Sequence, residues 1–120
     1  MKILLAIDDS EFSQAAVQSV VTRTWSPGTE VRVLHVVEPP ALLLGREMAG
    51  PDPEFETVWK ALREQAKSLV TKATDVLRKS CLNAKTVLIE GDPKSQIIDV
   101  AKEWPADLIV LGSHGRKGLS

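Results

Sequence analysis

The sequence predicts a single α/β domain built around an open parallel β-sheet. Apolar runs suited to strands alternate along the chain with segments of helical spacing, an order typical of parallel sheets joined by right-handed crossovers. The last run, residues 108–111, consists of four aliphatic residues, as in a strand covered on both faces. It leads straight into the glycine-containing loop 112–115, and ligands of open α/β sheets bind at that end of the strands. We therefore expect the other strand ends to converge on this loop.

A strand followed directly by a helix opens the chain. Residues 2–8 form a nearly continuous apolar run that ends in two carboxylates, which predicts a buried strand. Asp9 and Ser10 carry side chains preferred at a helix N-cap. Apolar residues follow helical spacing over residues 11–24, until the Ser-Pro-Gly sequence at 26–28 ends the pattern. The residues predicted to face the core from this helix are Phe12, Ala15, Ala16 and Val20.

A second strand and a long helix follow, separated by a proline-rich segment. Residues 30–37 predict a β-branched strand, which Pro39 and Pro40 must end because neither can donate a ladder hydrogen bond. Four of the seven prolines fall within residues 39–53, so we expect an irregular excursion there. Residues 54–80 then predict an amphipathic helix. Its apolar stripe consists of Val58, Leu62, Ala66, Leu69, Ala73, Val76 and Leu77.

The remainder of the chain predicts a strand, a short helix and a final strand. Residues 85–90 form the third strand. Asp92 is the expected N-cap of the helix that follows, with Pro93 at the first helical position, where its missing N–H costs nothing. Pro105 ends this helix, and residues 107–111 form the fourth strand. The predicted buried face of the helix is Ile97, Ile98, Ala101 and Trp104.

The composition of the chain limits its classes of partner. At 120 residues it is long enough for one domain with one core. Charged residues make up 26% and the net charge is −1, so nucleic acid and anionic membranes are disfavoured partners. No run approaches the roughly 20 apolar residues needed to span a bilayer. A single cysteine, Cys81, excludes an internal disulfide, no Cys and His cluster has metal-ligand spacing, and we expect a cytoplasmic protein.

The glycine loop at 112–115 allows three interpretations. Glycine tolerates positive φ and lets the backbone approach a ligand, so the N–H groups of the loop could hold the phosphates of a nucleotide. The loop could equally be a plain strand-to-helix turn, or a catalytic loop that uses His114. It is not a Walker A loop, which needs Gly-Lys-Ser/Thr after four variable residues, because Gly112 is followed by Lys117 and then Gly118.

Three other positions each have a functional and a structural interpretation. Asp8 and Asp9 could form a paired-carboxylate metal site, as in a receiver domain, but the region 51–53, where a receiver needs its phospho-accepting strand end, has no strand pattern. A helix cap and a ligand contact are therefore favoured for the pair. His35, within the second strand, is expected to be a packed and hydrogen-bonded residue. Cys81 has no nearby histidine or basic cluster to activate it, so a structural thiol is expected.

Four segments together resemble the universal stress protein family. They are ILLAID at 3–8, VLHVV at 33–37, GDP at 91–93 and DLIVLGSHG at 107–115, in this order and spacing along the chain. The resemblance implies a flavodoxin/Rossmann-like open parallel sheet of strand order 3-2-1-4 with helices on both faces. Within the single domain 1–120, the usual fifth strand and the helix before it are expected to be absent.

The resemblance also implies binding of ATP, with Mg²⁺ inferred only from the nucleotide. Family members that bind ATP carry the pattern G-x2-G-x9-G-[S/T], of which this chain has the first two glycines and ends before the third. Asp8 would sit by the adenosine, strand backbone would line the adenine pocket, and the two glycines would approach ribose and phosphates. The positions implied are Ala6, Ile7, Asp8, Val36, Leu111, Gly112, His114 and Gly115.

The function implied is that of a cytoplasmic stress-response module, a homodimer that acts by binding ATP and signalling, with at most slow ATP hydrolysis and no assigned catalytic residue. Two alternatives stay open. One is a nucleotide-free dimeric interaction protein that binds partners through residues 39–53. The other is an enzyme of the adenine-nucleotide hydrolase type, which would need an appended substrate domain.

Overall fold

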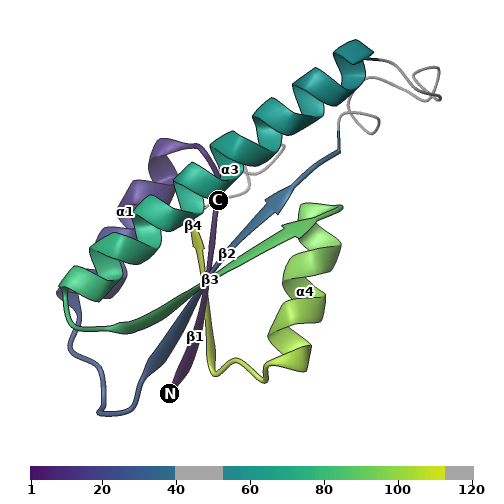
Figure 1. The fold of residues 1–120 in the computed structure, drawn as a ribbon. Helices are drawn as coiled ribbons and strands as arrows, with labels where there is room; N and C mark the ends of the chain where they lie inside the picture. Colours follow the sequence, from purple (N-terminus) through teal and green to yellow (C-terminus); the bar gives the residue numbers. More distant parts are fainter. Residues whose placement is uncertain (40–52, 113–120) are drawn as a thin grey trace.

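The computed structural model describes residues 1–39 and 53–112, which form a four-stranded parallel sheet with helices on both faces (Figure 1). The strand order is β3-β2-β1-β4, so the predicted fold class is confirmed. The strands are β1 (Lys2–Ile7), β2 (Glu30–Val37), β3 (Asn83–Glu90) and β4 (Leu108–Gly112). The helices are α1 (Glu11–Thr22), α3 (Pro53–Lys79) and α4 (Pro93–Glu103).

The predicted element boundaries are confirmed to within two residues. The limits of β2 match the prediction, while α1 ends two residues earlier and β3 begins two residues earlier than the patterns indicated. The limits of β1, α3 and β4 differ from the prediction by one residue. Of the irregular excursion predicted over residues 39–53, residues 40–52 lie outside the described part of the chain.

The start of α4 is capped as the sequence predicts. Asp92 Oδ2 accepts the backbone N–H of Ser95 at 3.0 Å and the hydroxyl of the same serine at 2.9 Å. Pro93 occupies the first turn. The aspartate therefore satisfies one of the N–H groups that the first turn of a helix leaves without an intrahelical partner.

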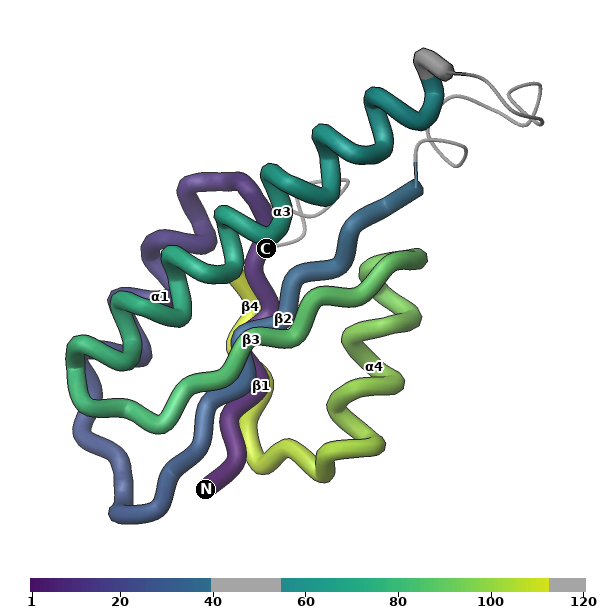
Figure 2. Tube along the Cα trace, viewed as in Figure 1, coloured from purple at the N-terminus to yellow at the C-terminus, as the bar shows by residue number. Residues whose placement is uncertain are grey.

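The helices divide between the two faces of the sheet according to the direction of the chain. From β1 to β2 to β3 the chain moves one way, and α1 and α3 lie together on one face (Figures 1 and 2). It then returns through α4, which lies on the opposite face, to place β4 on the far side of β1. Right-handed crossovers require this change of face when the direction reverses. We call the adjacent carboxyl ends of β1 and β4 the reversal point.

The central strand β1 contributes to a core on each face. Ile3, Leu5 and Ile7 pack in the cluster beneath α1 and α3, whereas Leu4 packs in the cluster beneath α4. Strand side chains alternate between faces, so burial of all these residues requires cover on both sides. The continuous apolar run at the start of the chain is thereby explained.

The buried face of α1 differs from the prediction. Its buried residues are Ser13, Ala16, Val17 and Val20, whereas Phe12 is 40% exposed and Ala15 is also exposed. The predicted face is centred one residue too early, because hydrophobic spacing favours the apolar Phe12 over the polar Ser13. A buried serine in the first turn of this helix is the feature that hydrophobic spacing could not predict.

The buried faces of α3 and α4 are also shifted from the predicted stripes. In α3, Val58 and Val76 are exposed, while Thr74 is buried and donates its hydroxyl to the carbonyl of Val70 at 2.8 Å. In α4, Val100 is buried and Ile98 is exposed. The N-terminal turns of α3 project beyond the sheet in Figure 1, so this part of the helix has no strands beneath it. The other differences arise because the side of each helix that packs on the sheet is rotated from the side that the apolar spacing predicts.

Strand β4 is covered on one face only, whereas the sequence predicted cover on both faces. Leu108 and Val110 pack against the cluster beneath α1 and α3, but Ile109 is 44% exposed and Leu111 is 58% exposed. The helix on that face, α4, packs with residues of β1, β2 and β3. Within the described residues, no helix lies over the outer face of β4. The burial predicted from its four aliphatic residues is therefore wrong for that face.

The C-terminus of α3 ends in a tight turn around Cys81. The N–H of Leu82 donates to the carbonyl of Leu77 at 3.1 Å, and the N–H of Cys81 donates to the carbonyl of Arg78 at 2.9 Å. This pair of bonds defines a Schellman motif, whose central residue must be left-handed. Cys81 has φ of 66° and an exposed side chain. The cysteine therefore stands where glycine is preferred.

Replacing Cys81 by glycine is expected to stabilise the protein by about 0.5–1 kcal/mol. Glycine removes the steric cost of a Cβ at positive φ, and this gain outweighs the extra freedom of glycine in the unfolded chain. Urea denaturation with reducing agent present measures the change. Cys81→Ala, which keeps the Cβ, should remain within about 0.5 kcal/mol of the parent. Equal stability of the glycine and alanine variants would contradict the strain assigned to this turn.

Candidate functional site

The reversal point brings together most of the positions predicted to bind a ligand. Ile7, the last residue of β1, pairs with Gly112, the last residue of β4, and Ala6 pairs with Leu111. Asp8 follows directly on Ile7. In open α/β sheets, ligands bind beyond the carboxyl ends of the strands at the point where the strand order reverses. The structure thus places these five positions at the edge where that rule expects a ligand.

The remaining predicted positions differ in what the structure describes. Val36 lies one residue before the end of β2, on the same sheet edge, and its side chain packs in the cluster beneath α4. His114 and Gly115 lie outside the described residues. Because the side chains of Ala6, Ile7 and Val36 are buried, only backbone groups of these three strand residues are suited to meet a ligand at this edge.

The carboxylate of Asp8 is held by two serines. Its Oδ1 accepts the backbone N–H of Ser10 at 2.9 Å and the hydroxyl of Ser10, and it lies 3.1 Å from the hydroxyl of Ser13. A carboxylate that accepts the N–H two residues further on forms an Asx turn, which fixes the chain as it leaves the strand. Asp8 therefore projects from the end of β1 as an oriented hydrogen-bond acceptor.

The N-cap of α1 is Ser10, one of the two residues predicted for it. Its side chain makes no cap bond, and its hydroxyl donates to Asp8. Asp9 is exposed. The two aspartates therefore have different environments, since Asp8 is bonded to serines and Asp9 faces solvent. Among the described residues, no group of three or more His, Cys, Asp or Glu side chains is placed to hold a metal ion.

Ser13 is a site residue that the sequence patterns missed. Its side chain is 4% exposed, and its hydroxyl accepts the backbone N–H of Asp8 at 2.7 Å. The same hydroxyl lies 2.7 Å from the carbonyl oxygen of Asp8 and is hydrogen-bonded to the carbonyl of Gly112. Ser13 thus joins the ends of β1 and β4. The available signal was a serine on the helical face shared by Ala16 and Val17.

Gly112 is required by the approach of α1 to β4. A Cβ built on this residue would lie 2.7 Å from the Cβ of Ala16 and 2.9 Å from the Cα of Ser13. A side chain at this position would therefore force α1 and β4 apart. Among the described glycines, only Gly28 and Gly91 have positive φ, so the positive φ expected of the glycine loop is not found at Gly112. Close packing, and not turn geometry, explains glycine at this position.

His35 is hydrogen-bonded within the scaffold beside the site. Its Nδ1 lies 2.8 Å from the carbonyl oxygen of Ile7, and the side chain is half-buried. Because a carbonyl oxygen only accepts, Nδ1 must carry the proton and donate it. This bond joins the end of β1 to β2, as expected of a packed histidine.

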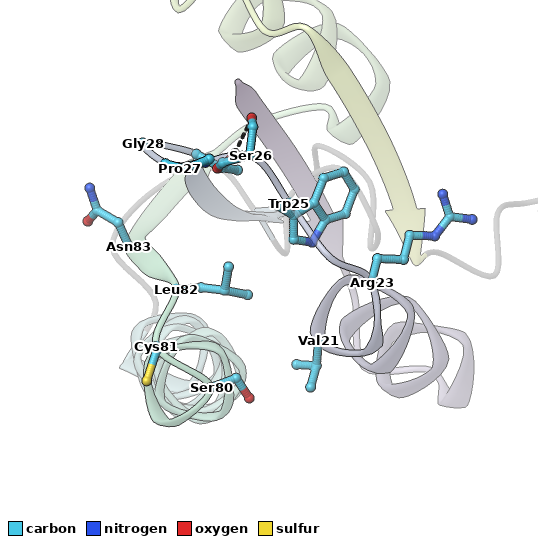
Figure 3. A pocket seen from close by; sticks show the side chains of 11 residues that line it. Val21, Arg23, Trp25, Ser26, Pro27, Gly28, Ser80, Cys81, Leu82 and Asn83 are labelled. Carbon is cyan, nitrogen blue, oxygen red and sulfur yellow. Dashed lines mark hydrogen bonds between the residues drawn. The ribbon is translucent and has the colours of Figure 1, made fainter.

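A cavity of about 400 Å³ lies at the other end of the molecule (Figure 3). It opens between the C-terminal ends of α1 and α3, where Val21, Trp25 and Leu82 line it. The indole N–H of Trp25 donates to the carbonyl of Val20 at 2.8 Å. Since these segments precede β2 and β3, the cavity is at the amino-terminal edge of the sheet. It does not coincide with the reversal point.

The fold and the reversal point define an open parallel α/β protein with an oriented carboxylate at the carboxyl edge of its sheet. The model of the universal stress protein family matches residues 1–120, and the chain belongs to this family. Universal stress protein MJ0577 of Methanocaldococcus jannaschii is 31% identical to this chain, over 98% of this chain and 79% of the relative.

Solved structures of family members share the fold. The structure of MJ0577 matches with a TM-score of 0.75 at 24% identity, over 90% of this chain and 71% of that chain. Universal stress protein UspA from Lactobacillus plantarum matches with a TM-score of 0.71 at 28% identity, over 92% and 75%. A family protein of Arabidopsis thaliana, solved with AMP bound, matches with a TM-score of 0.72 at 17% identity, over 100% and 81%.

Replacing Gly112 by alanine is expected to lower the free energy of unfolding by about 1–3 kcal/mol, because the added methyl group overpacks the contact between α1 and β4. Urea denaturation measures the loss. Combining it with Ala16→Gly removes one of the clashing atoms, so the double variant should be less destabilised than the sum of the single variants. Strict additivity would show that α1 and β4 do not meet at these two residues.

Proposed function

We propose that this protein is an ATP-binding member of the universal stress protein family, which acts by binding and signalling. The observation that carries the proposal is the carboxylate of Asp8, fixed by Ser10 and Ser13 at the reversal point. A rigid acceptor at this edge suits a ribose hydroxyl, since hydrogen bonds to a charged acceptor are stronger than neutral ones.

The backbone at the same edge supplies the chemistry that an adenine base needs. Ala6, Ile7 and Val36 present strand backbone near the carboxyl ends of β1 and β2, and peptide N–H and C=O groups can pair with the edge of a purine. AMP is bound to the Arabidopsis relative, which has the same fold. This likeness supports an adenine nucleotide as the ligand class.

The phosphates are proposed to follow the chain beyond Gly112, toward His114 and Gly115. Peptide N–H groups of glycines can hold phosphate oxygens closely. Mg²⁺, where it takes part, would be bound mainly through the nucleotide, because Mg²⁺ is held by substrate phosphates with few protein ligands in such sites.

Binding without turnover is favoured by how the nearby ionisable groups are used. Asp8 Oδ1 is already an acceptor for Ser10, and the proton on Nδ1 of His35 is donated to the carbonyl of Ile7. Both groups are bonded in positioning roles. We further propose that the protein is cytoplasmic and forms a homodimer. The exposed Ile109 and Leu111 support the dimer, because they leave apolar surface suited to association on β4, which is the last strand of the sheet among the described residues. Among the described helices, none is long and apolar enough to cross a membrane.

Replacing Asp8 by asparagine is expected to weaken ATP binding about tenfold, the effect of losing roughly 1.4 kcal/mol from a charged hydrogen bond. Asparagine keeps an oxygen that can accept from Ser10 and Ser13, so the fold should be preserved. Isothermal titration calorimetry with ATP and Mg²⁺ measures the affinity. Asp9→Asn is the matched control, because it removes the same charge from the adjacent exposed residue and should leave the affinity unchanged.

Two outcomes of this titration count against the proposal. Absence of binding to the parent protein at millimolar ATP would remove the nucleotide function and favour a nucleotide-free interaction protein. Equal losses from Asp8→Asn and Asp9→Asn would show that only the general charge of this edge matters. Steady release of ADP by the parent protein would instead favour the enzymatic alternative.

A further inference from the structure

Ser13 is a polar residue on an otherwise apolar helix face. The other buried residues of α1 are Ala16, Val17 and Val20. A buried hydroxyl that is not hydrogen-bonded lowers the free energy of unfolding, and it adds no apolar contact in return. Alanine at this position would continue the apolar face, but it would leave the N–H of Asp8 without this acceptor. The serine therefore needs an explanation in terms of its partners.

The partners of Ser13 belong to two different strand ends. Its oxygen accepts the N–H of Asp8, and the carbonyl of Asp8, the carboxylate of Asp8 and the carbonyl of Gly112 surround the hydroxyl as acceptors. A hydroxyl has one proton to donate, so the carbonyl of Gly112 competes for it with the two acceptors on Asp8. When the proton is donated to Gly112, Ser13 accepts from the end of β1 and donates to the end of β4.

This bridge lies where the pairing of the two strands stops. The register of β1 and β4 ends at Ile7 and Gly112, and the chain continues from Ile7 through Asp8 into α1. The Cα of Ser13 would also be 2.9 Å from a Cβ on Gly112, so the helix backbone is in close contact with the strand there. Hydrogen bonding and packing at Ser13 together set the separation between Asp8 and the start of the loop.

We infer that Ser13 is a positioning residue of the nucleotide site, and that its buried hydroxyl holds the backbone of Asp8, which carries the carboxylate, in register with Gly112. The inference rests on the proposed function. Ser13 acts through these two residues, since its own side chain is nearly inaccessible. An acceptor held in its bound orientation before the ligand arrives spares the entropy of ordering it on binding. The hydroxyl should therefore raise nucleotide affinity without touching the nucleotide.

A purely structural role for Ser13 makes a different prediction. If the hydroxyl only joins α1 to the sheet, its removal would lower stability and leave the affinity of the folded protein unchanged. Thr74 provides a matched comparison, because its buried hydroxyl donates to the carbonyl of Val70 on α3, outside the reversal point. Thr74→Val removes that hydroxyl with little change in volume.

The test compares Ser13→Ala with Thr74→Val by thermal unfolding and by calorimetric titration with ATP and Mg²⁺. Both variants should unfold at lower temperature than the parent protein. Only Ser13→Ala should also weaken ATP binding, about five- to tenfold. In the Asp8→Asn background the loss from Ser13→Ala should be smaller, because residues that act through one another are not additive.

Hydrogen exchange measured by NMR adds a readout that does not depend on nucleotide. In Ser13→Ala the amide of Asp8 loses its acceptor, so its exchange should quicken at least tenfold relative to the amide of Leu5 within β1. Unchanged exchange at Asp8 would overturn the bridge itself.

The outcomes separate this inference from the proposed function. If the parent protein binds ATP and Ser13→Ala binds it equally well, Ser13 is structural and only the inference fails. If Ser13→Ala and Thr74→Val weaken binding alike, the effect is a general one of stability and the inference also fails. If the parent protein does not bind ATP, the proposed function is overturned and the positioning role with it.

Discussion

The close contact between α1 and the last residue of β4 sets the geometry at the carboxyl edge of the sheet. A right-handed crossover brings α1 back over the strand from which it starts, and the strand order then places β4 beside β1. The helix therefore begins above the ends of two strands. Gly112 permits the backbones to approach, and Ser13 uses the short distance to bond both ends. Ser13 can bond to both strand ends only because Gly112 lets the helix approach the strand this closely.

The sequence predicted the features of this fold that depend on local chemistry. The order of elements followed from alternating apolar runs, and the cap of α4 followed from the aspartate and proline at 92–93. The predictions that failed concern which residues of a helix or strand are buried. Ile109 and Leu111 are aliphatic but exposed, since exposure depends on whether α4 reaches over β4. That is a property of helix placement, which the composition of a single strand does not contain.

The candidate site shows the same division. Five of the eight predicted positions meet at the reversal point, because topology alone brings the ends of β1 and β4 together. The contribution of Ser13 could not be predicted in this way. A serine in the first turn of a helix is ordinarily assigned to capping or to solvent, and its partners here come from residues 8 and 112, which are separated by most of the chain. Only the folded arrangement makes it a bridge.

The two ends of the sheet differ in how much they constrain the chain. At the amino-terminal edge, α3 ends in a turn that accepts a cysteine at positive φ, and a cavity separates it from α1. At the carboxyl edge, α1 packs against the backbone of Gly112 without room for a Cβ, and the hydroxyl of Ser13 is hydrogen-bonded to both strand ends. Tight packing of this kind resists small displacements, which is the property a site needs to hold an acceptor in place.

The packing of α1 against β4 gives a structural reason for glycine at position 112. A glycine at a strand end is the usual sign of a loop that approaches phosphate, yet here the contact with Ser13 and Ala16 demands glycine whether or not a nucleotide binds. The carboxylate of Asp8 forms an Asx turn, which asparagine or serine could also form. Its charge makes it a stronger hydrogen-bond acceptor than a neutral side chain, and the proposed nucleotide site uses that property. Gly112 therefore gives little support to a nucleotide by itself, and the proposal depends on the chemistry of Asp8.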